Sequence, residues 1–276
     1  MFFGRPKSRK KLLLGIVTPL FTVGLLVFSL VILPSHISGA ATKVTQNTIK
    51  IGYVGDSITV GVGSDGFPSA AQTEISLLGD TYEAVNEGVG GTTTNQWLPG
   101  GYTFDNAMAE FRQKGVTVVS IMLGTNDARN DQMTTSAQYV SNMRLIIHGL
   151  LSSGVIKAVI LNYPPYVSLG AQQGQWGTES QQRLTSYLKD IDTLVNGKTV
   201  LQGDTSSYSY FAAHLDQLAD GVHPNAIGHA YLGALWAASY TRLSTDRSRT
   251  LLVPLAYNST NGSLTRDQTT VQSAAW

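Results

Sequence analysis

From residue 49 onward, short β-rich runs alternate with amphipathic stretches, and this alternation limits the possible folds more than any other feature of the sequence. Such an order is typical of a parallel sheet with helices on both faces, a three-layer α/β/α fold. The third and fourth runs are almost wholly apolar, as expected of strands buried on both faces. We predict five strands, approximately Ile49–Val54, Tyr82–Asn86, Val116–Leu123, Val155–Leu161 and Thr199–Gln202.

Three helices are predicted from apolar residues at helical spacing, which places one face of each helix against a core. The first two are indicated by Val140, Met143, Ile147 and Leu150 and by Leu184, Leu188, Ile191 and Val195. The last is predicted over about 225–240, with Ile227, Tyr231, Leu235 and Trp236 on its buried side. The length of 276 residues with 42% hydrophobic residues suits one globular domain, for which we set bounds of 49–243.

The first strand is followed by Gly55, Asp56 and Ser57, at the sheet edge where α/β proteins bind ligands. A serine at this turn is a candidate nucleophile, because the start of the next helix supplies backbone N–H groups to a developing oxyanion. Taken alone, Ser57 is explained at least as well as a helix cap. The decision between these two interpretations depends on the loops that follow the other strands.

Two of those loops contain groups suited to an oxyanion hole. The loop after the second strand is glycine-rich, and we choose Gly91 as an N–H donor, with Gly90 as the alternative. After the third strand, Asn126 offers a side-chain amide, whereas Asp127 beside it is interpreted as structural. Each feature alone is also typical of an ordinary turn.

The loop before the last helix holds Asp220 and His223, three residues apart. At that separation a carboxylate reaches Nδ1 of the imidazole and fixes its tautomer, so that Nε2 is free to take a proton from serine. None of the other histidines, His36, His148, His214 and His229, has an acidic residue at this offset. We therefore predict Ser57, Asp220 and His223 as the catalytic residues.

These four blocks, GDSI with Ser57, GVGGT with Gly91, GTND with Asn126 and DGVHP with Asp220 and His223, resemble those of the SGNH hydrolase family of GDSL-type esterases and lipases. The resemblance covers roughly residues 49–240. It implies a flavodoxin-like sheet of strand order 2-1-3-4-5, a Ser-His-Asp triad, and an oxyanion hole made by the N–H groups of Ser57 and Gly91 and the Asn126 amide. Only Ile58 departs from the family motif, which has leucine there.

The resemblance implies hydrolysis of a carboxylic ester in a small molecule, glycan or lipid, and we favour short acyl groups on carbohydrate. No metal or other cofactor is expected. The alternatives are a lysophospholipase or thioesterase of the same fold, and a catalytically silent, exported binding domain. The glycine pattern over 61–66 also fits a dinucleotide-binding loop, but Gly55 to Ser57 already occupies the turn where that loop belongs.

Residues 1–41 carry five basic side chains and no acidic one, so the +1 formal charge of the whole chain becomes −4 for the rest. That balance gives no electrostatic reason to bind nucleic acid. The apolar run from residue 12 to 33 predicts a signal peptide or a membrane anchor, both of which place the domain outside the cytoplasm. We expect a linker over 42–48 and a polar, loosely packed tail over 244–276. The chain has no cysteine, which excludes disulfides and a thiolate nucleophile.

Overall fold

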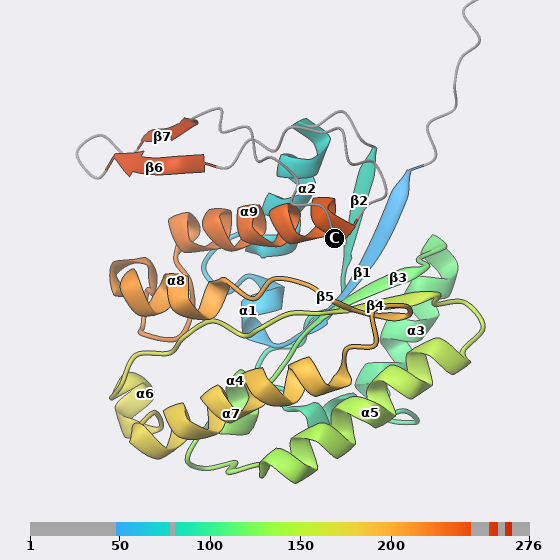
Figure 1. Cartoon of the computed structure of the whole chain (residues 1–276), viewed down its shortest axis with the longest axis horizontal. Helices are drawn as coiled ribbons and strands as arrows, with labels where there is room; N and C mark the ends of the chain where they lie inside the picture. Colours follow the sequence, from blue (N-terminus) through green and yellow to red (C-terminus); the bar gives the residue numbers. More distant parts are fainter. Residues whose placement is uncertain (1–47, 78–80, 244–253, 259–262, 267–276) are drawn as a thin grey trace, which may run out of the picture. The chain divides into compact units, whose positions relative to one another are not determined.

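The structure is a computed structural model that describes residues 48–77, 81–243, 254–258 and 263–266. The core of the fold is a five-stranded parallel sheet. The strand order β2-β1-β3-β4-β5 is the expected one (Figure 1). All five predicted strands are confirmed, although the third and fourth are shorter than expected. The strands are β1 Ile49–Gly55, β2 Tyr82–Asn86, β3 Val118–Met122, β4 Ala158–Leu161 and β5 Val200–Gln202.

The third and fourth strands were predicted to begin too early, because their first predicted residues belong to turns. The N–H of Val116 donates to the carbonyl of Phe111 and so belongs to the end of the preceding helix. The N–H of Val155 donates to the Ser153 hydroxyl at 3.2 Å. Both valines are apolar residues near the core, and hydropathy alone does not distinguish such residues from strand residues.

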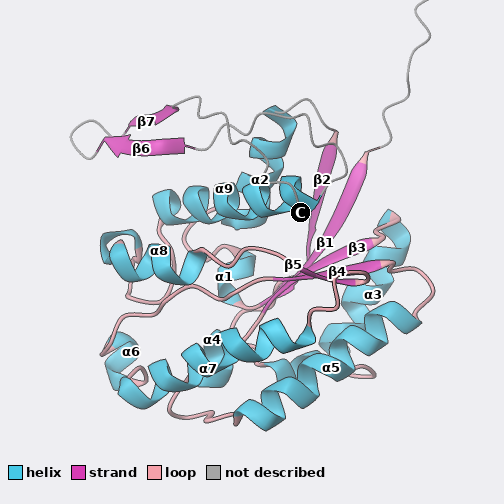
Figure 2. Ribbon diagram, in the orientation of Figure 1, coloured by secondary structure: helices cyan, strands magenta, loops and turns pink. Residues whose placement is uncertain are grey.

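Helices cover both faces of the sheet, which gives the predicted three layers (Figures 1 and 2). On one face, α3, α5 and α7 pack around Phe111, Ile146 and Leu184. On the other face, α2, α8 and α9 pack around Phe67, Phe211 and Trp236. The bounds are α2 Gly66–Leu77, α3 Tyr102–Lys114, α5 Ser136–Ser152, α7 Thr178–Leu194, α8 Ser207–Ala213 and α9 Ala226–Leu243.

The buried side of α9 differs from the predicted one. Trp236 is fully buried as expected, but Ile227, Tyr231 and Leu235 are only partly buried. The buried face instead runs through His229, Leu232 and Gly233, together with small residues. The prediction was wrong because it followed the large apolar residues, whereas α9 lies so close to α2 that a Cβ on Gly233 would be 2.5 Å from the Cβ of Ala70.

Because all five strands are parallel, their carboxyl ends meet at one edge of the sheet. Gly55 at the end of β1 pairs in register with Met122 at the end of β3. Five short helices form at this edge and in the connections that follow the strands, and two of them, α1 and α4, directly follow β1 and β3 (Figure 1). They are α1 Ser57–Val60, η1 Thr94–Trp97, α4 Thr125–Ala128, α6 Ala171–Gly174 and η2 Leu215–Gln217.

Several predictions concern parts of the chain outside the described residues. These are the export segment over 1–41, including the apolar run 12–33, and nearly all of the linker over 42–48. Within the expected tail over 244–276, two stretches are described, and they pair as an antiparallel hairpin of β6 Pro254–Asn258 and β7 Ser263–Arg266. Among the described helices, none has the length and apolar character needed to cross a membrane.

Candidate active site

The turn between β1 and α1 holds Ser57 at the first position of the helix. Asp56, not Ser57, is the helix cap, since its carboxylate accepts a hydrogen bond from the N–H of Ile58 at 3.0 Å. Gly55 makes the tight turn possible, because a Cβ there would lie 1.9 Å from the Thr59 hydroxyl and 2.8 Å from the Met122 carbonyl. The capping role is therefore filled by a neighbour, and the Ser57 hydroxyl is left free to bond elsewhere.

That hydroxyl bonds to His223 across 166 positions of sequence, with 2.8 Å between Ser57 Oγ and His223 Nε2. The opposite ring nitrogen, Nδ1, lies 2.8 Å from Oδ2 of Asp220. The other carboxylate oxygen of Asp220 accepts from the backbone N–H groups of Val222 and His223, at 2.9 and 2.8 Å. The three predicted catalytic residues are thus joined in one line of hydrogen bonds.

The Asp220 carboxylate is held as an anion at the rim of the site. Its side chain is 48% exposed, whereas that of His223 is 16% exposed. Partial burial raises its pKa, but the hydrogen bonds from His223 and Val222 outweigh this effect, and the pKa is lowered overall. An ionised Asp220 can accept a hydrogen bond from the Nδ1–H group of His223, which leaves Nε2 unprotonated and facing the Ser57 hydroxyl.

The glycine-rich loop after β2 lies directly beside Ser57. A Cβ on Gly90 would be 3.8 Å from the Cβ of Ser57, and Gly91 has a φ of +77° with open space on its side-chain side. Asn126 approaches the same loop, because its side-chain Nδ2 donates to the carbonyl of Thr92 at 3.0 Å. The second Nδ2 proton of Asn126 has no acceptor among the described residues, and neither do the backbone N–H groups of Ser57 and Gly91.

Asp127 holds the loop of Gly91 and the loop of Asn126 together, which fits the structural role predicted for it from the sequence. The side chain is fully buried, and it accepts from the Thr94 N–H at 3.0 and 3.2 Å and from the Thr94 hydroxyl at 2.5 Å. That hydroxyl in turn accepts from the Asn142 amide at 3.0 Å. The loop with Gly91 is thus tied to the loop with Asn126 and to α5.

Two buried titratable residues beside the site, Asp56 and His229, were not predicted from the sequence. Burial raises the pKa of Asp56 to about 7, and its Oδ2 has no hydrogen-bond partner in the described structure. Burial lowers the pKa of His229 on α9 to about 4. The backbone of Val62 opposes part of that shift, although neither ring nitrogen of His229 forms a hydrogen bond with a described residue. The GDS sequence marked Asp56 only as a neighbour of the serine, and an isolated histidine on a helix gave no signal for His229.

The remaining candidates from the sequence lie elsewhere or have structural roles. Gly61 and Gly66 face each other across the α1–α2 turn, where a Cβ on Gly61 would be 2.3 Å from Gly66, so they close a turn. His214 bonds to the Tyr210 carbonyl at 2.7 Å, and His36 lies outside the described residues.

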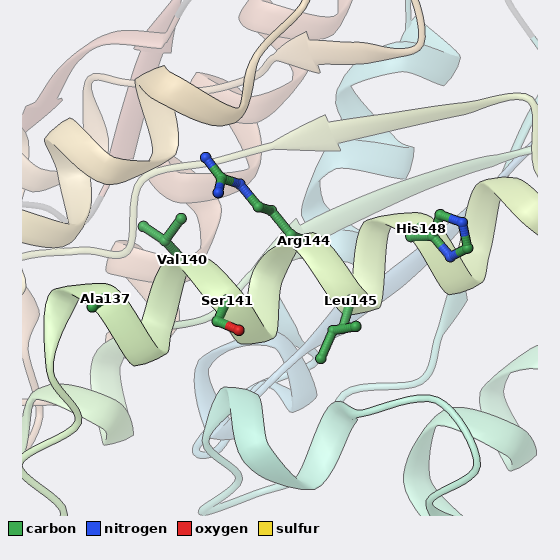
Figure 3. Close-up of a pocket in the computed structure, with 6 residues that line it drawn as sticks. All are labelled: Ala137, Val140, Ser141, Arg144, Leu145 and His148. Atoms are coloured by element: carbon green, nitrogen blue, oxygen red, sulfur yellow. The ribbon is translucent and has the colours of Figure 1, made fainter.

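A hollow on the outer face of the molecule is lined by residues of α5 alone (Figure 3). Figure 3 shows Arg144 and Leu145 leaving the helix in opposite directions, with His148 one turn further along. No residue of the hydrogen-bonded line from Ser57 to Asp220 contributes to it.

In the part of the chain that the structure describes, no group of three or more His, Cys, Asp or Glu residues is placed to hold a metal ion.

Comparisons with known proteins show which family and fold this chain shares. Residues 53–231 match the model of the GDSL-like Lipase/Acylhydrolase family. A multidomain esterase of Ruminococcus flavefaciens is 27% identical in an alignment over 253 residues that covers 78% of this chain and 31% of that protein. An uncharacterized protein of Mycoplasma pneumoniae is 31% identical in an alignment over 173 residues that covers 60% of this chain and 17% of that protein. The chain thus spans less than a third of the length of either relative.

Among solved structures, a lipase/acylhydrolase from Enterococcus faecalis superimposes with a TM-score of 0.54 at 25% identity, covering 69% of this chain and 94% of the other. An acetylxylan esterase from Geobacillus stearothermophilus shares the fold with a TM-score of 0.52 at 21% identity, covering 70% and 95%. The family match extends over more than half of the sequence and includes every residue of the site just described. The chain therefore belongs to the GDSL-like lipase/acylhydrolase family.

Proposed function

We propose that this chain hydrolyses carboxylic esters with Ser57 as the nucleophile. The observation that carries the proposal is the line of two 2.8 Å hydrogen bonds from Ser57 through His223 to Asp220. A nucleophile, a base in contact with it and a carboxylate that orients the base form the arrangement that serine hydrolases use on several unrelated folds. Membership of the family supports the same class of reaction.

In the first step, Ser57 Oγ attacks the ester carbonyl carbon while Nε2 of His223 takes the hydroxyl proton. The tetrahedral intermediate then collapses, the bond to the alcohol oxygen breaks, and His223 returns the proton to that oxygen. In the second step, water gives a proton to His223 and attacks the acyl carbon. The second tetrahedral intermediate collapses, the bond to Ser57 Oγ breaks, and His223 returns the proton to that oxygen, which releases the carboxylic acid and restores Ser57. All protons pass through Nε2, so the mechanism needs no cofactor.

The negative charge of each tetrahedral intermediate is stabilised by the N–H groups of Ser57 and Gly91 and by the Asn126 amide. Donors fixed in advance suit this role, because they need no reorganisation when charge develops. Asn126 is fixed by its own bond to the Thr92 carbonyl and by the Asp127 contacts to Thr94. Loss of one such donor typically costs about 3 kcal/mol of transition-state stabilisation.

For the substrate, we propose a short acyl group, acetyl first, on a carbohydrate alcohol. The fold shared with an acetylxylan esterase supports this choice, and the sequence similarity to a multidomain esterase supports ester hydrolysis in general. The nucleophile lies beside the exposed loop of Gly90 and Gly91, an arrangement that suits a bulky alcohol reaching the ester from solvent. A preference for long-chain or lysophospholipid esters would instead favour the alternative of a lysophospholipase.

The test of the nucleophile is Ser57→Ala, assayed on 4-nitrophenyl acetate and with a fluorophosphonate probe. We expect hydrolysis to fall to background and labelling to disappear, while the circular dichroism spectrum stays unchanged. Ser209→Ala on exposed α8 is the matched control and should behave as the unaltered protein. Activity retained in Ser57→Ala would refute the assignment, and an unaltered protein that neither hydrolyses esters nor reacts with the probe would favour a silent binding domain.

We also propose that the domain acts outside the cytoplasm, secreted or tethered by residues 12–33. The support is the basic stretch followed by an apolar run in the sequence. Digestion of intact cells with a protease distinguishes the outcomes. A tethered domain is degraded from outside, a secreted one is found in the medium, and a domain protected within intact cells would contradict the proposal.

A further inference from the structure

The connection between β4 and α7 includes a segment, residues 168–175, that packs against the loop of the catalytic histidine; we call it the strap. The N–H of Ser168 donates to the carbonyl of Gly221 at 2.8 Å. Gly221 has a φ of +83°, and a Cβ there would lie 3.0 Å from the Cβ of Ala171 and 3.1 Å from that of Ser168. The strap thus contacts the chain two residues before His223.

Two residues of the strap have a backbone conformation that favours glycine. Gln172 has φ 48° and ψ 54°, and Gln173 has φ 57° and ψ 37°, both in the left-handed region. Gly170 and Gly174 on either side have φ values of 80° and 85°. Glutamine in this conformation costs free energy that glycine would avoid, and strained residues of this kind are concentrated at functional sites.

The side chains of these two glutamines are available to a ligand. Gln173 is exposed and Gln172 is half-buried, and neither side-chain amide bonds to another described residue. Elsewhere in the domain, Gln138 and Gln181 use their amides within the protein, on Asn142 and on the Val167 carbonyl. The strap therefore presents the unused amides of Gln172 and Gln173, besides that of the half-buried Gln175, and each amide has two donors and one acceptor.

The chemistry around the strap indicates a neutral, hydroxyl-rich ligand. Residues 163–178 contain no Lys, Arg, Asp or Glu, so the segment offers no charged partner to a phosphate or an ammonium group. Leu169 is 59% exposed in the same segment and provides an apolar surface. Amides beside an apolar side chain match the alternating hydroxyl and C–H faces of a sugar ring.

The reaction determines which half of the ester meets the strap. His223 gives its Nε2 proton to the leaving alcohol oxygen, so the alcohol lies against the loop that carries His223. We propose that Gln172 and Gln173 bind hydroxyl groups of the alcohol half of a sugar ester, and so select the leaving group. This inference rests on the proposed ester hydrolysis and adds the residues that recognise the alcohol.

The test replaces both glutamines by methionine, Gln172→Met with Gln173→Met, which keeps side-chain length and the strained backbone but removes the amides. The two substrates, 4-nitrophenyl acetate and an acetylated xylooligosaccharide, pass through the same acetyl-enzyme and differ only in the alcohol. We expect kcat/KM to fall about 10-fold on the sugar ester, the loss of two hydrogen bonds, and less than about 2-fold on the nitrophenyl ester. Gln113→Met, exposed on α3, is the control and should change neither value.

An independent measurement uses the acetyl-enzyme formed from 4-nitrophenyl acetate, with xylobiose added as an acceptor. We expect the methionine variant to transfer less acetyl to xylobiose, relative to water, than the unaltered protein does. Equal losses on both substrates, an unchanged sugar ester rate, or an unaltered protein inactive on the sugar ester would each overturn the inference. Failure of the proposed function itself is distinguishable, because then 4-nitrophenyl acetate and the fluorophosphonate probe would not react with Ser57 at all.

Discussion

At the scale of single residues, the role of Ser57 depends on what its neighbour does. A serine at the start of a helix usually accepts a hydrogen bond from the helix N–H groups, and that bond would turn its oxygen away from a substrate. Here Asp56 accepts the bond from Ile58, and the Ser57 oxygen faces Nε2 of His223. The same four residues of sequence thus support either role, and the capping contact of Asp56 separates the two.

The exposure of Asp220 leads to a prediction about the relative importance of the triad residues. Because its side chain is 48% exposed, water can take its place beside Nδ1 of His223 when it is removed. We expect Asp220→Ala to lower kcat/KM about 100-fold less than His223→Ala does, while KM changes little in either. Initial rates on 4-nitrophenyl acetate provide the comparison, and equal losses in the two variants would show that water does not substitute for the carboxylate.

At the scale of elements, the position of α9 is set by small residues rather than by large ones. Gly233 allows α9 to lie against the backbone of α2, with a hypothetical Cβ at 2.5 Å from the Cβ of Ala70 and 2.7 Å from the N of Ala71. This contact matters to the site, because α9 begins three residues after His223 and α2 follows the turn that carries Ser57. The close packing of α2 and α9 thus helps to hold the side chains of Ser57 and His223 next to each other.

Replacement of Gly233 by leucine should therefore damage both stability and activity. The added side chain has no space between the helices, and we expect a loss of about 1–3 kcal/mol in the free energy of unfolding, with a lower kcat. Urea unfolding followed by circular dichroism measures the first quantity. Ala226→Leu, at an exposed position of the same helix, should change stability by less than about 0.5 kcal/mol; similar losses in both variants would argue against a close helix contact.

At the scale of the whole molecule, two buried groups beside the site make opposite contributions to the pH dependence of stability. The pKa of Asp56 rises from 3.8 to about 7 on folding, so between these values the folded state holds a proton that the unfolded state has lost, and stability falls as pH rises. The pKa of His229 falls from 6.5 to about 4, so the unfolded state holds the extra proton and stability rises with pH. Between pH 4 and 6.5 the two effects largely cancel.

Removal of either group should reveal the contribution of the other. We expect the free energy of unfolding of Asp56→Asn to rise with pH from 4.5 to 6.5, relative to the unaltered protein, and that of His229→Gln to fall. Each difference has an upper limit of about 1.4 kcal/mol per pH unit. Urea titrations at pH 4.5, 5.5 and 6.5 provide the measurement, and since all other groups are common to the three proteins, parallel pH profiles would contradict the assigned shifts.

The sequence by itself determined the sheet and was enough to predict the residues of the candidate site. Strands buried on both faces are nearly continuous apolar runs, and the polar residues that follow them reach one edge because parallel strands end together. Ser57, Gly91, Asn126, Asp220 and His223 were predicted in this way, since each lies in a loop that follows a strand or precedes a helix. Local chemistry could indicate these residues because their surroundings are short loops.

Only the tertiary structure decided the features that depend on contacts between distant segments. The buried face of α9 was predicted wrongly, because periodicity weighs large apolar residues and the close approach to α2 selects small ones. The opposite pKa shifts of Asp56 and His229 follow from burial, which no single residue specifies. The left-handed pair in the strap is likewise invisible in the sequence, where two glutamines carry no sign of a positive φ, and the packing of residues 168–171 on Gly221 is what gives them a place beside His223.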